Sequence, residues 1–433
     1  MFLTVEKLIY GGDGLARTPA GADGRSMAVF VPFVLPGEQV EAEIAQQKPG
    51  FARGRVTRMV EASAERTAAR CPYFQRCGGC HYQHIPYERQ LEFKAKVLRE
   101  TMQRVAKIEL NHEIKLHASP PWNYRNRTRL QVQTTPEFAL GYFRFGSHEI
   151  LPVRECPISS PLLQRMIAQL IELRGGECPA EVEEIEFFAD AADEHLLVWA
   201  FCARGADIRR LSPWAERLQR HLPEIAGVSF FPSRRRSEDE PAVDMRPLTQ
   251  WGAPAIRYRV GETGYRVSAG AFFQVNRYLL EKLVSVVTSN ASGETALDLY
   301  AGVGLFSAVL ARSFHHIFAV EASQISYSDL VQNVSANVKA VGTRTEDYLR
   351  NRPVRNRPDL VVIDPPRTGA GGAVTRWLVE LGAPRIRYVS CDPATLARDL
   401  APLLASGYRI EEAHLFDLFP QTYHVESVVL LAR

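Results

Sequence analysis

A cysteine near the C-terminus stands where a thiol could act as a nucleophile. Arg387–Ser390 has the apolar pattern of a strand, Cys391 follows it directly, and Pro393 opens an amphipathic helix. In an open α/β sheet, ligands bind at the carboxyl ends of the strands, so side chains placed there can reach them. A lone cysteine is more often buried in the core. The motifs that accompany Cys391 favour the catalytic interpretation.

A carboxylate stands at the start of the last apolar run of the chain. Glu426 precedes Val428–Leu431 and lies within the sequence His424–Ser427. Charged residues at strand ends are usually solvated, so Glu426 alone would indicate little. Beside a thiol it becomes a candidate general base.

A glycine turn is typical of a nucleotide-binding unit. The expected strand Thr295–Tyr300 leads into Gly302 and Gly304, and a helix is expected from about Leu305. The next expected strand ends at Glu321, whose carboxylate could accept hydrogen bonds from a ribose. The third glycine of a dinucleotide fingerprint is missing, which argues against a pyrophosphate cofactor.

A second acidic turn follows the expected strand Leu360–Ile363. Asp364 ends this strand and is followed by Pro365 and Pro366. Two prolines make the turn rigid. Asp364 is therefore expected at the ligand edge of the same sheet.

Three of the seven cysteines lie on one short loop. Cys71, Cys77 and Cys80 have a C-x5-C-x2-C spacing, and two glycines let the backbone fold tightly around an inorganic centre. Four thiolates would bind either zinc or an iron–sulfur cluster, and the spacing favours the cluster because it is not that of a zinc finger. Cys156, in a loop before a proline, is the first candidate for the fourth ligand. The competing candidates are Cys178 and Cys202.

Two basic stretches suit a nucleic-acid partner. Lys48 and Arg53 flank Phe51, and cations with an interleaved ring fit single-stranded nucleic acid, although a solvated charged face is equally compatible. In the second stretch, arginines alternate with other residues, so a strand would place them on one face, where they could bind phosphates. A solvated strand face is the alternative, but clustered like charges repel without an anionic partner. These arginines are Arg125, Arg127 and Arg129.

The composition is that of a globular protein of several domains. The 433 residues are 46% hydrophobic and 23% charged, and the net charge of +3 is compatible with an acidic partner. No apolar run is long enough to span a bilayer, and the N-terminus lacks a signal-peptide pattern. We therefore expect a cytoplasmic protein with no membrane partner.

The periodicity predicts particular elements. A helix is expected from Tyr87 to about Ala106, and an Arg- and acid-rich loop is expected at Ser233–Glu240. Short alternating segments separated by Gly and Pro predict a small N-terminal barrel, with a turn at Gly11–Gly14. Its expected strands are Val5–Ile9, Ala28–Pro32, Gln39–Ile44 and Gly54–Met59.

Taken together, these stretches closely resemble the RNA 5-methyluridine methyltransferases, the family that methylates carbon-5 of uracil in ribosomal and transfer RNA. The resemblance covers nearly the whole chain. Gly270–Asn276 matches the family's F-F-Q-V-N segment, and D-L-Y-A-G-V-G, D-P-P-R, S-C-x-P-A-T-L-A-R-D and H-V-E-S-V follow in order. Residues 1–60 look like the TRAM RNA-binding barrel.

The resemblance implies a fold and a set of domains. We expect a TRAM-like, OB-like β-barrel over residues 1–62 and a central α+β domain over residues 63–265, which carries the [4Fe–4S] site and an RNA-binding surface. An α/β Rossmann-like methyltransferase domain is expected over residues 266–433. The family's four-cysteine site matches Cys71, Cys77, Cys80 and Cys156.

The resemblance also implies a mechanism. The Cys391 thiolate would add to carbon-6 of a flipped-out uracil, which makes carbon-5 nucleophilic toward S-adenosylmethionine, and Glu426 would then remove the proton from carbon-5. The cofactor site would include the turn Gly302, Gly304 and Leu305. The further residues implied to contact S-adenosylmethionine or the uracil are Gln274, Tyr300, Glu321 and Asp364.

Three positions depart from the family pattern. Asp392 stands where many relatives carry Asn, Ala301 stands where many carry Cys, and Arg344 lies where relatives usually offer Asp or Asn to the adenine. The adenine contact is therefore unassigned. The TRAM-like barrel favours ribosomal over transfer RNA as substrate, and nothing in the sequence requires more than a monomer. The alternatives are a transfer-RNA uridine methyltransferase and a catalytically silent RNA-binding or assembly factor.

Overall fold

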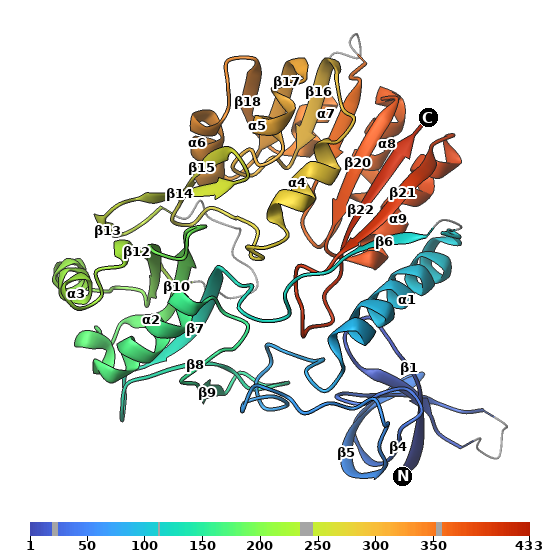
Figure 1. Cartoon of the computed structure of the whole chain (residues 1–433), viewed down its shortest axis with the longest axis vertical. Helices are drawn as coiled ribbons and strands as arrows, with labels where there is room; N and C mark the ends of the chain where they lie inside the picture. The colour runs from blue at the N-terminus through green and yellow to red at the C-terminus, as the bar shows by residue number, and fades with distance from the viewer. Residues whose placement is uncertain (20–24, 111–112, 234–245, 352–356) are drawn as a thin grey trace.

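The computed structural model describes residues 1–19, 25–110, 113–233, 246–351 and 357–433. The predicted loop Ser233–Glu240 lies outside the described residues from position 234 onward, and so does the arginine run at 234–236. In the described part of the chain, no helix is both long and apolar enough to cross a membrane. Figure 1 shows an N-terminal barrel, a central sheet with its helices and a C-terminal α/β layer.

The N-terminal strands close into a barrel, as the sequence predicted. Alternate residues of the strands point inward, so that Leu3, Val5, Val29 and Val31 form its core. The turn expected at Gly11–Gly14 was placed too late, because Gly14 already opens the second strand. The barrel order is β1-β2-β3-β5-β4, and its strands are β1 (Phe2–Leu8), β2 (Gly14–Arg17), β3 (Ala28–Val31), β4 (Gln39–Lys48) and β5 (Phe51–Glu61).

The central sheet has seven strands in the order β13-β12-β11-β10-β7-β8-β9. Every residue of its inner strand β11 is buried, including Cys202 at its end. The strands are β7 (Arg127–Gln133), β8 (Ala139–Phe143), β9 (Ile150–Pro152), β10 (Val182–Ala189), β11 (Leu196–Cys202), β12 (Ile225–Pro232) and β13 (Thr249–Gly252). Its helices are α2 (Pro161–Glu172), the short 3-10 helix η1 (Arg174–Gly176) and α3 (Ile208–His221).

The C-terminal sheet has eight strands in the order β18-β17-β16-β19-β20-β22-β21-β6. The strands β18, β17, β16, β19 and β20 run parallel to one another. Strand β22 runs antiparallel to both of its neighbours, β20 and β21. The strands are β6 (Ile114–His117), β16 (Gly293–Leu299), β17 (Phe314–Glu321), β18 (Val338–Gly342), β19 (Leu360–Ile363), β20 (Arg385–Ser390), β21 (Arg409–Phe416) and β22 (Glu426–Ala432).

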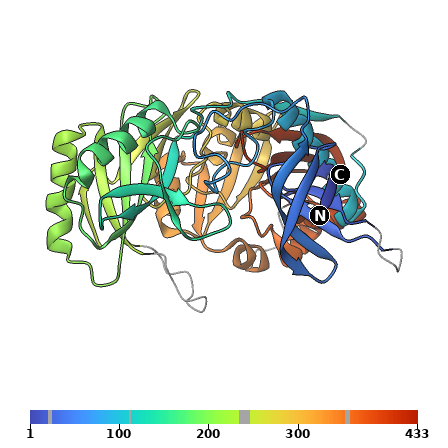
Figure 2. The same cartoon turned by 90° about the horizontal axis from the view of Figure 1, so that it is seen from below.

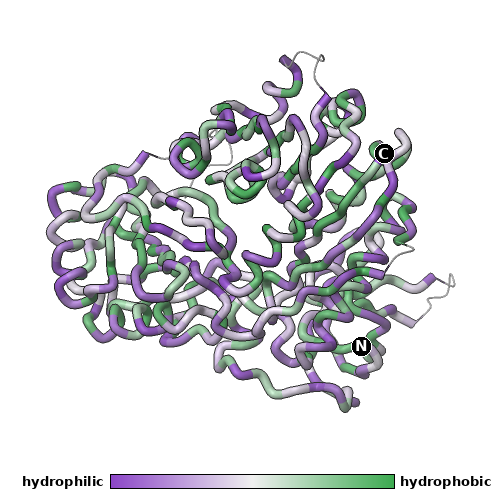
Figure 3. Tube along the Cα trace, turned by 45° about the horizontal axis from the view of Figure 1, so that its top comes forward, coloured by the Kyte–Doolittle hydropathy of each residue, from purple (hydrophilic) through white to green (hydrophobic). Residues whose placement is uncertain are grey.

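Helices cover both faces of this sheet, as in a doubly wound fold. Apolar residues alternate along each strand between two separate cores, one on each face. Figure 3 shows these hydrophobic stretches along the strands. The helices are α4 (Leu280–Thr288), α5 (Ser307–Leu310), α6 (Gln324–Asn333), α7 (Thr345–Asn351), α8 (Gly371–Leu381) and α9 (Pro393–Ala405), and a hairpin of β14 (Ala255–Val260) and β15 (Thr263–Ser268) precedes them.

A segment from the first half of the chain completes the C-terminal layer. Helix α1 (Tyr87–Ala106) has the predicted bounds and packs against α9, and β6 pairs in parallel with β21 at the edge of the sheet. Both elements lie in the range expected for the central domain. In Figure 1, α1 lies between the barrel and β6, the edge strand of the C-terminal sheet. Figure 2 shows the barrel and the central sheet at opposite ends of the molecule.

Candidate active site

The carboxyl ends of the parallel strands enclose a cavity of about 510 Å³. The glycine turn after β16 and the acid that ends β17 line it, together with the proline turn after β19 and the cysteine after β20. Residues far apart in the sequence therefore meet at the edge where a doubly wound sheet binds its ligand. The candidate residues that line this cavity are Gln274, Tyr300, Gly302, Leu305, Glu321, Asp364, Cys391 and Glu426.

The sheet register brings the candidate nucleophile and the candidate base together. Ser390 of β20 pairs with Ser427 of β22 in the antiparallel ladder, so Cys391 and Glu426 are the next facing positions. The Ser427 hydroxyl donates a hydrogen bond to the Ser390 carbonyl at 3.2 Å, which ties the two strand ends together. A thiol and a carboxylate thus face one cavity from adjacent strands.

The turn that carries Cys391 is fixed by the cap of α9. Asp392 accepts hydrogen bonds from the backbone N–H groups of Ala394 and Thr395, both at 2.9 Å, so it is the N-cap of the helix. The Asp392 N–H donates to the Ser390 hydroxyl at 3.2 Å. An Asn would accept these bonds equally well, which explains why the departure at position 392 leaves the turn intact.

The Cys391 thiol is protonated in the resting site. Burial raises its pKa to about 12, and the Glu426 and Asp364 carboxylates add to this effect, whereas the Arg367 guanidinium lowers it. The negative groups of the site therefore oppose thiolate formation. A proton acceptor or a change in these neighbours on substrate binding is needed before the sulfur can attack.

Two carboxyl groups of the site, those of Glu426 and Asp364, have raised pKa values. Burial, and then the nearby Asp364, hold the pKa of Glu426 well above its usual range. Burial raises the pKa of Asp364 to about 7, with a further contribution from Asp298, whose own pKa burial raises to about 7. A carboxyl group with a raised pKa is a stronger base once it is ionised, which suits proton abstraction from carbon.

The glycine turn leaves room for a ligand close to the backbone. Gly302 has φ +57°, and a Cβ built on it would have no atom within 4 Å, so its side toward the cavity is open. Gly304 has φ +89°, but a Cβ there would meet Leu330 at 2.8 Å, and this glycine does not line the cavity. Its role in the structure is close helix packing. The Glu321 carboxylate accepts hydrogen bonds from the N–H groups of Gly302 and Ser323 at 2.8 and 2.7 Å, so it stands at a fixed place beside the turn.

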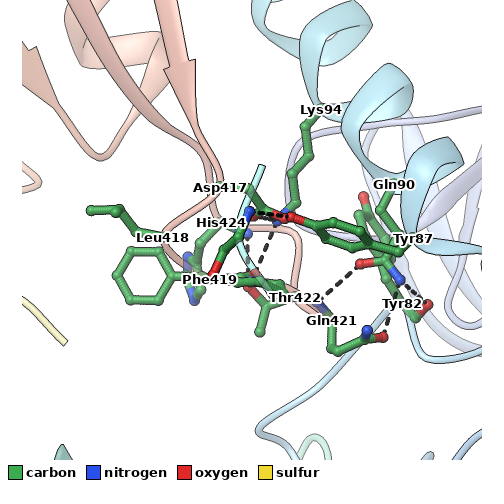
Figure 4. Close-up of polar contacts among 12 residues, drawn as sticks. Tyr82, Tyr87, Gln90, Lys94, Asp417, Leu418, Phe419, Gln421, Thr422 and His424 are labelled. Atoms are coloured by element: carbon green, nitrogen blue, oxygen red, sulfur yellow. Dashed lines mark hydrogen bonds and ion pairs between the residues drawn. The ribbon is translucent and has the colours of Figure 1, made fainter. Parts of the chain in front are cut away.

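The segment Asp417–His424, which joins β21 to β22, is held in place by α1 (Figure 4). The Lys94 ammonium donates to the Asp417 carboxylate at 2.6 Å and to the Phe419 carbonyl at 3.0 Å, and Lys94 and Asp417 are both buried. Gln90 and Gln421 exchange hydrogen bonds at 2.9 and 3.0 Å. Phe419 lines the cavity and Glu426 follows the segment, so helix α1 positions one wall of the site.

The four candidate cluster cysteines line one small cavity of about 60 Å³, separate from the first. Arg125 lines it too and is half-buried, and its buried Nε has no hydrogen-bond partner in the described part of the chain. Among the described residues, no three His, Cys, Asp or Glu side chains lie close enough together to hold a single metal ion. The cysteines that line the cavity are Cys71, Cys77, Cys80 and Cys156, and Cys178 and Cys202 are not among them.

The predicted arginine row does not present three free cations. Arg125 lies before β7 and is turned to the cysteine cavity. Arg129 pairs with Glu186 and stacks over Phe201, and Arg127 donates to the Ala271 carbonyl at 2.9 Å and pairs with Glu186 at 3.4 Å. The anionic partner that clustered arginines require is thus supplied within the protein. RNA contact by these residues stays a prediction.

The basic stretch of the barrel borders an open groove. Arg53 lines a cavity of about 850 Å³ between the barrel and residues 145–146, together with Phe30, Phe33 and Arg66. Arg53 also pairs with Asp13 at 3.5 Å. The ring of Phe51 lies 5.3 Å from that of Phe30, beside the groove, and Lys48 faces Phe51 across the β4–β5 pair. Rings and guanidinium groups therefore occur together on this surface.

Sequence reasoning did not single out two side chains that line the main cavity. Arg367 was quoted only as part of D-P-P-R, and Phe419 lies in a segment without a motif. Arg367 follows two prolines at the ligand edge, which was the available signal. Nothing local marked Phe419, because its position depends on Lys94 from α1. Arg344, noted as a departure, is exposed and pairs with Glu346 at 3.6 Å, and it does not line the cavity.

Comparisons with known proteins agree with this geometry. A family model described as tRNA (Uracil-5-)-methyltransferase matches residues 255–348 and 354–433, and a TRAM domain model matches residues 2–57. The chain is 33% identical to the 23S rRNA (uracil(1939)-C(5))-methyltransferase RlmD of Halomonas elongata, over 99% of this chain and 89% of the relative. The chain belongs to the RNA uracil-C5 methyltransferase family.

Other relatives of this methyltransferase support the same assignment. It is 31% identical to an uncharacterized RNA methyltransferase of Halalkalibacterium halodurans, over 99% of this chain and 96% of the relative. The crystal structure of Pyrococcus abyssi tRNA (uracil-54, C5)-methyltransferase in complex with S-adenosyl-L-homocysteine superposes with a TM-score of 0.73, at 25% identity and full coverage of both chains. The predicted fold class, a TRAM-like barrel with a Rossmann-like methyltransferase layer, is confirmed.

Proposed function

We propose that this protein methylates carbon-5 of a uridine in RNA through a covalent adduct on Cys391. The observation that carries the proposal is that Cys391 and Glu426, on adjacent strand ends, share one cavity with the glycine turn, Glu321 and Asp364. A thiol, a carboxylate and a cofactor-sized recess are the parts that this reaction requires. The family assignment supports each of them.

The protein's own residues carry the chemistry on the base. The Cys391 sulfur adds to carbon-6 of uracil, and the electron pair of the carbon-5–carbon-6 double bond moves toward the carbonyl at carbon-4, which makes carbon-5 nucleophilic. S-adenosylmethionine, when bound, supplies an electrophilic methyl group. Glu426 then takes the proton from carbon-5, the double bond re-forms and the sulfur leaves as a thiolate. The uridine must leave its stack to reach the cavity.

The residues present fit a bound S-adenosylmethionine. The open side of Gly302 gives backbone access, and the Glu321 carboxylate stands beside it to accept hydrogen bonds from a ribose. Tyr300, Leu305, Gln274 and Asp364 complete the lining that the sequence assigned to cofactor or uracil. We propose these residues as the binding site, with Gly304 as a packing residue of the same turn.

We propose ribosomal RNA of the large subunit as the substrate, rather than transfer RNA. Curated relatives at 33% identity act on 23S rRNA according to their names, whereas the solved transfer-RNA enzyme is 25% identical. The groove beside Arg53 and the TRAM match support binding of an RNA segment by the barrel. The proposed RNA contacts are Lys48, Phe51, Arg53, Arg125, Arg127 and Arg129, and a monomer suffices for them.

The test is nucleoside analysis after incubation with labelled S-adenosylmethionine and unmodified ribosomal or transfer RNA, each in a separate reaction. Label in 5-methyluridine of ribosomal RNA only is the expected result. Label in transfer RNA only would replace the substrate. RNA binding without label in either pool would favour the silent binding factor. Substantial turnover by Cys391→Ala would overturn the covalent mechanism.

We further propose a [4Fe–4S] cluster at Cys71, Cys77, Cys80 and Cys156. The four cysteines line one cavity, as the thiolate ligands of such a cluster would. Arg125, with a buried and unsatisfied Nε beside the thiols, supplies a positive charge that a cluster with four thiolates would balance. The cluster would hold the loop of residues 71–80 against the central domain.

The three-domain division remains part of the proposal. The barrel and the two sheets support a boundary near residue 62. The expected boundary at residue 265 falls inside β15, whose hairpin with β14 packs on one core of the C-terminal sheet, so we place the second boundary before β14. The elements α1 and β6 are an exception, because they are packed on the C-terminal layer although their sequence precedes the central sheet.

A further inference from the structure

The loop after β1 of the barrel reaches the turn that carries the nucleophile. The Tyr10 hydroxyl donates a hydrogen bond to the carbonyl oxygen of Cys391 at 3.4 Å, across 381 positions of sequence. The side chain of Asp392 interacts with the same hydroxyl. The RNA-binding barrel and the catalytic turn are therefore in direct polar contact.

Further contacts hold the loop with Tyr10 against the segment that precedes Glu426. The Tyr10 ring packs edge-on against Tyr423 with centroids 5.8 Å apart, and Tyr423 precedes the general base by three positions. Gly12 of the same loop is close to Tyr423, since a Cβ on Gly12 would lie 3.1 Å from that ring. Burial, and then the Asp392 carboxylate, raise the pKa of Tyr10, so its hydroxyl keeps its proton and can donate.

The groups that Tyr10 contacts also position the nucleophile. Asp392 caps α9, and the Cys391 carbonyl belongs to the peptide unit between the thiol-bearing residue and that cap. A donor at this carbonyl limits rotation of the peptide unit and so limits the directions that the sulfur can take. An attacking atom must approach carbon-6 along a narrow path, so a small misplacement lowers the rate of addition strongly.

We propose that Tyr10 is a positioning residue that orients Cys391 from the barrel, so that the barrel contributes to the chemical step in addition to binding RNA. This inference rests on the proposed function, in which Cys391 attacks uracil. The pairing of Tyr10 with Asp392 gives the departure at position 392 a role, because a carboxylate is a stronger acceptor for the phenol than an amide.

The test compares Tyr10→Phe with wild type in two readouts on the full-length protein. The first is the single-turnover rate of methyl transfer at saturating RNA and cofactor, and the second is the dissociation constant of the RNA. We expect Tyr10→Phe to lower the rate about tenfold or more and to leave RNA binding within about twofold, because the ring remains while the donor is lost. An unchanged rate would overturn the inference.

Two further variants separate positioning from packing. Tyr408→Phe removes a tyrosine hydroxyl that donates to the Ala383 carbonyl at 2.7 Å, at the opposite end of β20, and we expect it to leave the rate unchanged. Tyr10→Ala removes ring and hydroxyl together. If Tyr10→Ala lowered the rate of methyl transfer while Tyr10→Phe kept the wild-type rate, ring packing on Tyr423 would explain the effect and the inference would be wrong.

A separate variant tests the proposed covalent mechanism. Cys391→Ala is assayed alongside, and loss of turnover there with no effect of Tyr10→Phe would reject only the role of Tyr10. Retained turnover in Cys391→Ala would reject the covalent mechanism itself, whatever Tyr10→Phe does.

Discussion

At the scale of single residues, the site places the proposed nucleophile and the proposed base on neighbouring strand ends. Cys391 and Glu426 face one cavity, and the Glu426 carboxylate raises the pKa of the Cys391 thiol. The two groups act at different moments of the proposed reaction, so their charges need not coexist. This arrangement leads to two predictions with defined signs.

Glu426→Gln should trap the methylated RNA on the protein. Without a carboxylate to remove the carbon-5 proton, the thioether to Cys391 cannot be eliminated and should survive denaturation. The covalent protein–RNA complex should appear as a band on a denaturing gel only when S-adenosylmethionine is present, and Cys391→Ala should abolish this band. Glu380→Gln, an exposed change on α8, should behave as wild type. A Glu426→Gln enzyme that turns over normally would exclude Glu426 as the base.

Alkylation of Cys391 should respond in opposite directions to two charge removals. Glu426 raises the pKa of the thiol and Arg367 lowers it, so Glu426→Gln should increase the thiolate fraction and Arg367→Met should decrease it. At pH 8, below the thiol pKa of about 12, the rate follows this fraction, with about tenfold per unit of pKa. Peptide mass spectrometry after iodoacetamide treatment measures the rate in the absence of RNA. Arg376→Met, an exposed change on α8, is the control, and changes of the same sign in both variants would point to access rather than charge.

At the scale of elements, the sequence predicted the residues that line the site better than the contacts that hold those residues in place. The glycine turn, the proline turn and the cysteine each follow a strand with a clear apolar pattern, and parallel strands bring their ends together whatever lies between them. The helix Tyr87–Ala106 was predicted with its bounds because its apolar face is periodic. These are local signals.

The supports depend on pairings that no local signal reveals. Lys94 looks like a surface lysine of an amphipathic helix, but it is buried against Asp417, 323 positions later. The spacing of Arg127 and Arg129 was read correctly as one strand face, yet the anions that they meet are Glu184 and Glu186 of the neighbouring strand β10. Tyr10, between the expected strand Val5–Ile9 and the expected turn Gly11–Gly14, was not singled out. In each case the partner comes from a distant segment.

Loss of the buried ion pair should destabilise the protein through the segment Asp417–His424. Lys94→Met leaves the Asp417 carboxylate buried without its cation, which typically costs about 3–5 kcal/mol, and the double variant Lys94→Met with Asp417→Leu should recover much of this. Urea denaturation measures the free energy of unfolding of each variant. Lys7→Met breaks the exposed pair with Glu100, also at 2.6 Å, and should cost less than about 1 kcal/mol. Equal losses in the two lysine variants would contradict a special role of the buried pair.

At the scale of the whole molecule, the cysteine loop and the active site are linked through a short stretch of backbone. The N–H groups of His81 and Tyr82, directly after Cys80, donate to the Gln421 carbonyl at 2.8 and 2.9 Å. Gln421 lies in the segment that Lys94 also holds. A centre bound at the cysteines would therefore fix, through the backbone, a wall of a cavity that it does not line.

Removal of one cysteine ligand should loosen that wall. We expect Cys156→Ala to lower the iron and sulfide content of anaerobically purified protein and to speed amide hydrogen exchange at residues 81–82 and 417–424, because the loop loses its anchor. Cys178→Ala should change neither measurement, since Cys178 does not line the cysteine cavity. Full iron content in Cys156→Ala, with loss in Cys178→Ala, would transfer the fourth ligand to Cys178.

The position of strand β6 determines which fragments of the chain can be expressed with an intact C-terminal sheet. It pairs with β21 through Ile114–His117 and covers one edge of the C-terminal sheet. A fragment beginning at residue 266 would expose the backbone donors and acceptors of β21, a template for pairing between copies, and would leave Asp417 without Lys94. The C-terminal sheet therefore includes a strand from before the central sheet, and its natural unit for expression or for transfer to another RNA-binding module begins upstream of α1.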